Sequence, residues 1–376
     1  MINIYLFLLV VLCISYLICL KYKKYEKPIY AILMVGMWLI LCIRYGQGSD
    51  YFSYHDLFEK FSDFNVALYN PNDEHGEIGF RLLCAIFPFR YQWFIIAVST
   101  FEMWMLHRFI KYYSKNPLLT LFLFYPTYYL TYYFSIIRQG IVIAAFIGAL
   151  MKWIEEKKWI RYYIVSLLLV TMHSTALVLL IVPFLKYIRL KDILIVDMLS
   201  AVIGIFLSTS FGIAIISRVP QLAAYASADV SVFSLLERAL LFGILLLLYF
   251  YRKKFLEDAT ATWWLKMYGV GVAIYLMFLA FPLISSRFMA LFKVLEVIIL
   301  PMLLEGRSKY RQFIIAFLIV FTGFMTCKNL DSYLEQGSYH VDVKFYTYPY
   351  ITVFDKDAIW EYREYSQYQK FLNSLK

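Results

Sequence analysis

INIYLFLLVVLCISYLICL, residues 2–20, carries no charged side chain, and KYKKYEK, residues 21–27, follows it at once. A helix that crosses a membrane needs about 20 mostly apolar residues, so this stretch is long enough to cross. A cleaved signal peptide has its positive charge before the apolar run and small residues at the end, and this stretch has neither. Because basic residues collect on the cytoplasmic side, we expect a retained helix that enters from outside.

The composition of the whole chain agrees with this start. Of its 376 residues 62% are apolar and 16% are charged, whereas a soluble domain has about 45–50% and about 25%. These figures exclude a disordered chain, a nucleic-acid-binding protein with a solvated basic surface and an ordinary soluble enzyme. They indicate an all-α polytopic membrane protein.

Ten crossings are expected in one membrane domain, residues 1–327. After residues 2–20 they fall at 28–43, 91–110, 117–134, 135–151, 192–213, 233–250, 262–282, 287–304 and 312–327. Residues 44–90 are too rich in acids to cross, and we expect an extracytoplasmic loop whose short helices lie at the membrane surface. Residues 328–376 are expected to form an extracytoplasmic polar tail, in which 355–375 has the pattern of a surface helix.

Residues 162–187 are expected to form a re-entrant hairpin. As a single crossing they would put Lys186, Arg189 and Lys191 outside and reverse every later loop, against the charge rule. The later basic groups concerned are Arg252, Lys253, Lys254, Arg307, Lys309 and Arg311. Each arm has roughly a dozen residues, about 18 Å at the helical rise, so the turn near His173 stays within the membrane. With this topology the cytoplasmic segments hold 21 of the 36 Lys and Arg, and the net +10 is an orientation signal.

Polar residues near membrane depth are costly and are therefore functional candidates. RYGQGSDYFSY, residues 44–54, begins where the second helix leaves the membrane. Its glycines permit a tight turn, and Arg44 lies where a lipid phosphate would lie. Asp50 supplies a carboxylate, while Tyr51 and Tyr54 supply rings of the kind that stack on sugars. The alternative is an aromatic anchor with a surface helix capped by Asp50.

Four further candidates are expected on the same, outer side. Glu77 begins the motif EIGF, and Arg138 precedes Gln139 at the start of a crossing. His173 stands at the hairpin turn, and Arg287 follows two serines at another helix start. Arginine suits bidentate phosphate contacts. The alternatives are a solvated loop carboxylate for Glu77, a snorkelling side chain for Arg138 and a hydrogen-bonded core residue for His173.

The remaining polar residues suggest structural roles. Lys293 and Glu296, spaced i, i+3, are expected to pair with each other. We expect structural contacts for Glu102, His107 and Asp197 and buried structural thiols for the five cysteines. His55 and His75 lie among loop acids without metal-binding spacing, and no Walker, GxGxxG or GxSxG motif appears. We therefore expect no metal and no other cofactor.

The motifs at residues 44–54, 77–80, 137–140 and 172–174, in that order, resemble the EpsG family of Wzy-like bacterial polysaccharide polymerases. These act in capsule, exopolysaccharide and O-antigen assembly. The resemblance covers about residues 40–190; the second half is similar in being helical and in placing Arg287 near a helix start.

The resemblance implies a polymerase of lipid-linked sugars. Such an enzyme joins oligosaccharide repeat units carried on undecaprenyl diphosphate at the outer face of the bacterial cytoplasmic membrane. The diphosphate is the leaving group, and no nucleotide sugar is used. A flippase and a chain-length regulator are the implied protein partners, and no nucleic acid is expected.

The expected roles follow from this chemistry. The diphosphate would be bound by Arg138, Arg44 and Arg287. The proton of the acceptor hydroxyl would pass to His173, Asp50 or Glu77, and His173 is preferred because an imidazole titrates near pH 6.5. The sugar would be held by Gln139, Tyr51 and Tyr54. A transporter or flippase of the same lipid, or an outer-face ligase or acyltransferase, remains an alternative.

Overall fold

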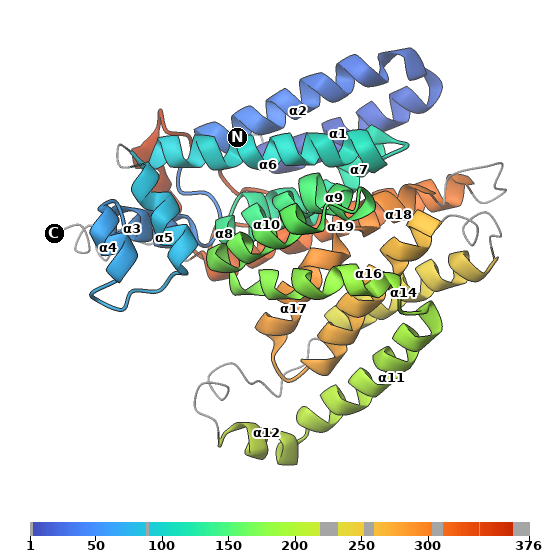
Figure 1. Cartoon of the computed structure of the whole chain (residues 1–376). Coiled ribbons are helices and arrows are strands. Elements are labelled where there is room, and N and C mark those ends of the chain that lie inside the picture. The colour runs from blue at the N-terminus through green and yellow to red at the C-terminus, as the bar shows by residue number, and fades with distance from the viewer. Residues whose placement is uncertain are drawn as a thin grey trace. The chain divides into compact units, whose positions relative to one another are not determined.

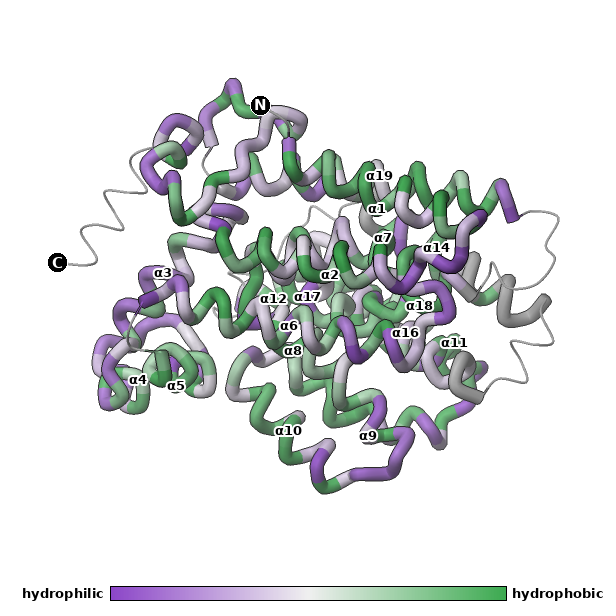
Figure 2. Tube along the Cα trace, turned by 90° about the horizontal axis from the view of Figure 1, so that it is seen from above, coloured by the Kyte–Doolittle hydropathy of each residue, from purple (hydrophilic) through white to green (hydrophobic). Residues whose placement is uncertain are grey.

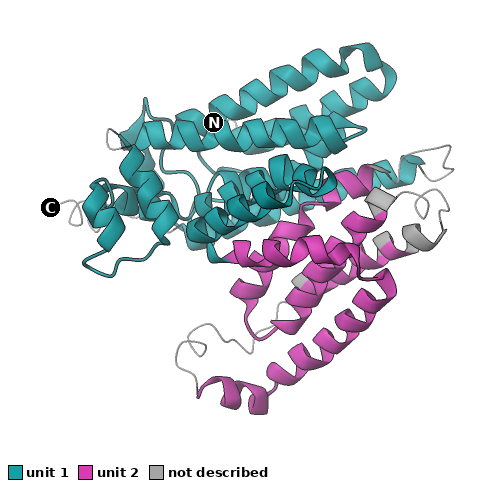
Figure 3. Cartoon of the chain, in the orientation of Figure 1, with its two compact units in different colours: residues 1–174, 304–376 teal, residues 175–303 magenta. Residues whose placement is uncertain are grey.

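The computed structural model describes residues 3–87, 90–218, 232–251, 259–302, 311–337 and 339–363. Throughout this part of the chain the elements are helices, joined by turns and supplemented by two isolated β-bridges. The prediction of an all-helical chain is confirmed. The helices fall into two compact units, residues 1–174 with 304–376 and residues 175–303 (Figure 3).

The first unit contains both ends of the chain (Figure 1). Its elements before residue 90 are α1 (Ile4–Lys21), η1 (Lys23–Tyr25), α2 (Glu26–Ile43), α3 (Tyr51–Lys60), α4 (Phe64–Tyr69) and α5 (Ile78–Ile86). They continue with α6 (Tyr91–Tyr113), α7 (Pro117–Phe124), η2 (Tyr125–Tyr133), α8 (Ile137–Ala145), η3 (Phe146–Leu150), α9 (Met151–Glu155) and α10 (Trp159–Met172). The unit ends with α19 (Arg311–Gln336) and η5 (Lys356–Glu361). The predicted short helices between residues 44 and 90 are present as α3, α4 and α5.

Four helical segments within the described residues are long and apolar enough to cross a membrane. They are Ile4–Lys21, Lys23–Ile43, Ile137–Glu155 and Arg311–Gln336. Two bent pairs, α5 with α6 and α11 with α12, raise the number to six if each pair is one span. The count of ten crossings stays a prediction, because α7, α17 and α18 are too short to qualify by themselves and α14 and α16 are not among the candidate spans. Two of the clusters of basic residues that were used to predict this number of crossings, at 252–254 and 307–309, lie outside the described residues.

Hydropathy follows the elements of the first unit. Figure 2 shows apolar residues along α1, α2 and α10 and polar residues gathered over α3 and α4 and around the turn between α9 and α10. Asn3 begins the first span, since its side chain accepts hydrogen bonds from the backbone N–H groups of Tyr5 and Leu6.

The aromatic run at residues 125–133 forms the core of the first unit. It is a π-helical continuation of α7, and nearly all of its side chains are buried. The buried hydroxyls find backbone acceptors on other helices: Tyr125 donates to the carbonyl of Tyr5 at 2.7 Å and Tyr129 to that of Met37 at 2.7 Å. These bonds fix the run against α1 and α2.

The C-terminal tail folds onto the turn that follows α2. Helix α19 extends to Gln336, past the predicted end of the last crossing. The backbone N–H of Tyr45 then donates to Ile351 and that of Val353 to Ile43, each at 2.9 Å. The described part of the predicted helix at 355–375 is the short turn η5, and residues 364–375 lie outside the described residues.

The second unit is a separate group of helices. Its elements are η4 (Ser174–Lys186), α11 (Leu190–Leu207), α12 (Ser210–Ile216), α14 (Val232–Tyr251), α16 (Ala259–Met277), α17 (Pro282–Lys293) and α18 (Glu296–Met302). Helix α16 packs against α11, α14 and α17.

The expected pair of Lys293 with Glu296 is wrong. The ammonium of Lys293 forms an ion pair with Glu237 of α14, and Glu296 accepts a hydrogen bond from the Tyr268 hydroxyl at 2.5 Å. Because the helix is broken between α17 and α18, the i, i+3 geometry assumed for this pair does not hold there.

The helix break predicted near residues 171–175 is present. Helix α10 ends at Met172, His173 is extended with φ −159° and ψ 130°, and η4 begins at Ser174. The two arms, of 14 and 13 residues, belong to different units. The re-entrant hairpin therefore stays a prediction.

Candidate functional site

The turn after α2 brings Asp50 to the start of α8. Gly46 and Gly48 have φ of +63° and +88°, which residues with a Cβ rarely adopt. A Cβ on Gly48 would also meet the Cβ of Ser135 at 3.0 Å. The Ser135 hydroxyl lies 2.9 Å from that of Ser49 and accepts from the backbone N–H of Asp50 at 3.2 Å. The glycines are therefore needed for this close approach.

Glu77 connects the starts of α5 and α8 with the residue that follows His173. It stands at the N-cap of α5, and one carboxylate oxygen forms an ion pair with Arg138 in the first turn of α8. The other oxygen accepts the backbone N–H of Ser174, the first residue of η4, at 3.2 Å. A single carboxylate thus holds the guanidinium and the chain after α10 together.

Arg138 is buried and faces a histidine as well as a carboxylate. It is 7% exposed, and its Nη2 lies 3.0 Å from Nε2 of His75. Since a guanidinium only donates, Nε2 of His75 is the acceptor in this contact. The guanidinium carbon also lies 5.8 Å from the ring centre of Tyr54 and 5.7 Å from that of Phe80.

His173 completes the group, which we call the Arg138 cluster: Arg138, Glu77, His75 and His173. His173 is 4% exposed and lies close enough to Glu77 for their charges to interact. Burial by itself would raise the pKa of the Glu77 carboxyl. The charges of Arg138 and His173 and the N–H of Ser174 outweigh burial and hold that pKa below its usual value. Glu77 is therefore an ionised carboxylate at neutral pH.

Five of the residues expected in a site lie together in or beside this cluster: Asp50, Tyr54, Glu77, Arg138 and His173. Asp50 is close enough to the Tyr54 hydroxyl for their charges to interact. The residues come from the loop at 44–90 and from the starts of two later segments, so motifs far apart in the sequence share one place.

Three other expected residues lie in the core beside the cluster. Arg44 is fully buried. Its guanidinium donates to the carbonyl of Leu41 at 2.7 Å and to the Ser99 hydroxyl at 3.2 Å. Tyr51, 2% exposed, packs edge-on against other aromatic rings. Gln139 is also fully buried. Their contacts with a ligand stay predictions.

Arg287 belongs to the second unit. It lies in α17, six positions into the helix that begins at Pro282, and it is half-buried. Its expected role in binding diphosphate stays a prediction.

Sequence reasoning missed two parts of the site. In the sequence His75 lies among loop acids, although its position two residues before Glu77 is a signal that it shares the site. The tail was given no role, yet Nη1 of Arg363 donates to the carbonyls of Gly46 at 3.0 Å and Gly48 at 3.3 Å. No local pattern connects residue 363 with residue 46, so only the fold reveals this contact.

The apolar spans and the cluster at their ends define a class: a polytopic helical membrane protein with a buried arginine–carboxylate–histidine site. Comparison with known proteins adds the family. The EpsG family model matches residues 27–352, most of the chain, and the chain belongs to the EpsG family. No curated protein and no solved structure matches. Family membership indicates a polymerase role in polysaccharide biosynthesis, and the predicted family is confirmed.

Proposed function

We propose that this protein polymerises oligosaccharide repeat units carried on undecaprenyl diphosphate, at the outer face of the bacterial cytoplasmic membrane. The observation that carries the proposal is the Arg138 cluster. It combines a buried guanidinium, which suits a phosphate oxygen, with two imidazoles and a carboxylate within one group. Glycosyl transfer from a diphosphate needs an anion site and a proton acceptor side by side.

The reaction has one bond made and one bond broken. The oxygen of the acceptor sugar attacks the anomeric carbon of the growing chain, and the bond from that carbon to the diphosphate breaks. The electron pair leaves with the diphosphate, and the acceptor proton passes to a base. Arg138 would stabilise the charge that develops on the departing oxygen, with Arg44 and Arg287 as further proposed contacts.

The structure supports a histidine as the base rather than Glu77. A carboxylate whose pKa is held below its usual value is a weak proton acceptor at neutral pH. Glu77 is instead placed to orient Arg138 and Ser174. We assign the proton to His173, with Asp50 as the other candidate, and we add His75, whose Nε2 is released when the guanidinium turns to phosphate.

The direct test uses purified full-length protein and a defined lipid-linked repeat unit. We expect longer lipid-linked chains to form without a nucleotide sugar. Transfer to a different acceptor would instead indicate a ligase, and an unchanged substrate would indicate a transporter or flippase. Either of these two results would overturn the polymerase assignment.

Arg138→Ala tests the site within the same assay. Loss of one preorganised donor to a developing anion costs about 10²–10³-fold in rate, and we expect a loss of that size. Arg161, an exposed arginine of α10 outside the cluster, gives the matched control Arg161→Ala. Full activity of Arg138→Ala in correctly inserted protein would remove Arg138 from the mechanism.

A further inference from the structure

A polar cavity lies in the first unit, at the far end of α1 from the Arg138 cluster. Its volume is about 190 Å³, room for several water molecules. Its lining residues are Tyr16, Cys19, Leu20, Lys23, Glu26, Asn116 and Arg311. It therefore combines the last turns of α1, the turn η1 and the starts of α2, α7 and α19.

The cavity lies at the level expected for lipid headgroups. The span Ile4–Lys21 ends beside it, and the spans Lys23–Ile43 and Arg311–Gln336 begin beside it. By the charge rule this end, with Lys21, Lys23, Lys24 and Lys27, is the cytoplasmic end. A ligand here would meet the inner leaflet.

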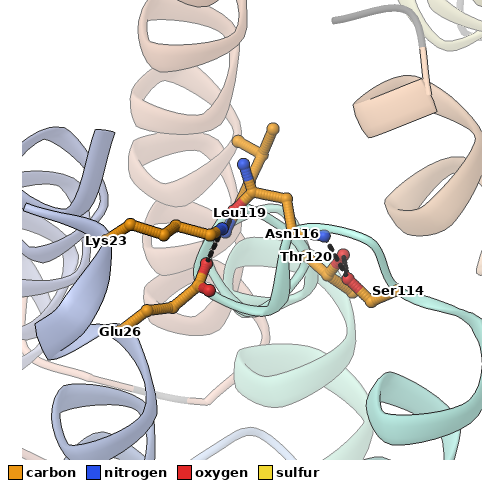
Figure 4. A network of polar contacts seen from close by, with 6 residues as sticks. All are labelled: Lys23, Glu26, Ser114, Asn116, Leu119 and Thr120. Carbon is orange, nitrogen blue, oxygen red and sulfur yellow. Dashed lines mark hydrogen bonds and ion pairs between the residues drawn. The ribbon is translucent and has the colours of Figure 1, made fainter. Parts of the chain in front are cut away.

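The hydrogen bonds around the cavity leave a buried hydroxyl without a partner. Figure 4 shows Lys23 paired with Glu26 at 2.7 Å and Asn116 held next to Ser114 and Thr120 at the start of α7. Tyr16 is 1% exposed, and its hydroxyl has no hydrogen-bond partner among the described residues. A buried hydroxyl of this kind is costly unless a bound molecule satisfies it.

The charged side chains that line the cavity are Lys23, Glu26 and Arg311. Glu26 offsets Lys23, and Arg311 has no ion-pair partner within the described part of the chain. Among the described residues one positive charge is therefore left over, together with the hydroxyl of Tyr16 and the side-chain amide of Asn116. Cys19 and Leu20 add an apolar wall. One uncompensated guanidinium matches an anion with a single negative charge.

We propose that this cavity binds the phosphodiester of an anionic phospholipid of the inner leaflet. Arg311 donates to the phosphate oxygens, since a guanidinium binds phosphate in a bidentate way. The Tyr16 hydroxyl donates to a phosphate or glycerol oxygen, and Leu20 contacts the start of the acyl chains. The site would fasten α1, α2, α7 and α19 together at this end and is independent of the polymerase proposal.

The test is a titration of full-length protein in neutral detergent with short-chain phosphatidylglycerol, monitored by calorimetry. We expect saturable binding, weakened about tenfold or more by Arg311→Gln, because bonds to charged groups are the strong ones. The matched control is Lys27→Gln, which removes an exposed positive charge of the same end outside the cavity. An equal loss in both variants would reveal only diffuse attraction and would overturn the site.

Tyr16→Phe separates binding from folding. Without lipid, its thermal midpoint should equal or exceed that of the wild type, because it removes a buried hydroxyl that has no partner among the described residues. With phosphatidylglycerol, its affinity should fall about two- to tenfold. Unchanged affinity would overturn the role of the hydroxyl.

Two further ligands distinguish the sources of phosphate. Inorganic phosphate and short-chain phosphatidylcholine, which has no net charge, should each bind at least tenfold more weakly than phosphatidylglycerol. Inorganic phosphate binding as tightly as the lipid would overturn the assignment to a phospholipid. Phosphatidylcholine binding equally tightly would overturn the argument from charge.

Discussion

Glu77 makes the arrangement of the Arg138 cluster depend on a single side chain. Its two oxygens serve different partners, the guanidinium of Arg138 and the backbone N–H of Ser174. Only the first partner requires a charge, because an amide oxygen can accept an N–H as well as a carboxylate can. The two roles can therefore be separated by a substitution that keeps the shape.

Glu77→Gln should lower the turnover number about tenfold and leave the thermal midpoint within a few degrees of the wild type. The Glu77 side chain is 28% exposed, but the substitution leaves the buried guanidinium of Arg138 without its carboxylate, so the loss costs about 1–3 kcal/mol. The measurement is turnover with the lipid-linked unit beside a melting curve. Glu77→Ala, which also removes the acceptor for Ser174, should be less stable. Wild-type turnover in Glu77→Gln would contradict the positioning role.

The two histidines of the cluster should differ in the pH dependence of turnover. If His173 is the base, the wild-type rate falls on the acid side as the imidazole is protonated. His173→Gln should be slow at every pH and lack this fall. His75→Gln should keep it, since His75 contacts the guanidinium. If the fall in rate at low pH is lost in His75→Gln and kept in His173→Gln, the two assignments are reversed.

His55 gives a prediction about stability. Its ring stacks on Tyr91 with centres 4.4 Å apart, and it faces Lys356, Asp56 and Glu59. Burial, helped by the charge of Lys356, lowers the pKa of His55 from 6.5 to about 4. Between these values the unfolded chain binds more protons than the folded chain, so stability falls as the pH drops from 6.5 to 4.

We expect this fall to shrink in His55→Phe, which keeps a stacking ring and cannot be protonated. The shift corresponds to about 3 kcal/mol at full effect, and the thermal midpoint measured between pH 7 and pH 4 reports it. His107, which lies next to Tyr30 away from this group, provides the control His107→Phe. Equal pH dependence in wild type and His55→Phe would contradict the assignment.

At the scale of elements, the tail acts as a support for the turn at residues 44–50. The guanidinium of Arg363 is 1% exposed, lies between the rings of Phe52 and Tyr339, and donates to the carbonyls of Gly46 and Gly48. Arg363→Ala would leave the Gly48 carbonyl without that donor, whereas the Gly46 carbonyl keeps the Tyr339 hydroxyl at 3.3 Å. An unsatisfied buried group costs about 1–3 kcal/mol, and the lost ring contacts of the guanidinium add to this.

Arg363→Ala should therefore lose about 2–4 kcal/mol of stability and reduce polymer formation with it, because Asp50 follows directly on this turn. Lys344→Ala, an exposed tail residue, is the control. Arg363→Lys should restore stability in part, since an ammonium can reach one carbonyl but lacks the fork of donors. Wild-type stability and activity in Arg363→Ala would show that the tail does not support the site.

The elements also show what the sequence can predict. Apolar runs and their charged ends predicted the helices before residue 160, and the polarity of residues 44–90 predicted short helices there. The break at His173 followed from charge alone. The predicted ion pair between Lys293 and Glu296 was wrong because the prediction assumed a continuous helix. The contact of Arg363 with Gly46 joins residues more than 300 positions apart. Periodicity carries no information about such pairs.

At the scale of the whole molecule, contacts within the first unit hold residues near both chain termini at the same end of its membrane-spanning helices. Asn3, at the start of α1, donates to the carbonyl of Phe345 at 2.8 Å, and the tail pairs with residues 43–45 at the end of α2. The start of α19, at Arg311, lies instead beside the turn η1 between α1 and α2. The described residues nearest the two chain ends thus lie at the same end of these spans, and we expect an even number of complete crossings.

An even number of crossings favours a re-entrant hairpin at 162–187, because a crossing there would raise the predicted ten crossings to eleven. The test is labelling of single cysteines in a cysteine-free background by a maleimide that does not enter cells. Phe354→Cys, in the tail at 84% exposure, should be labelled in intact cells. Tyr187→Cys, at 80% exposure after the second arm, should react only after lysis.

A single crossing at 162–187 predicts a different pattern for this pair of variants. Tyr187→Cys would then be labelled from outside. The tail would lie inside, which its hydrogen bond with Asn3 contradicts, unless another of the predicted crossings is absent and the tail stays outside. The positive residues around Tyr187 would also lie outside, against the charge rule. Labelling of Tyr187→Cys in intact cells would thus overturn the hairpin, and failure to label Phe354→Cys would overturn the outward orientation of the tail and of the Arg138 cluster.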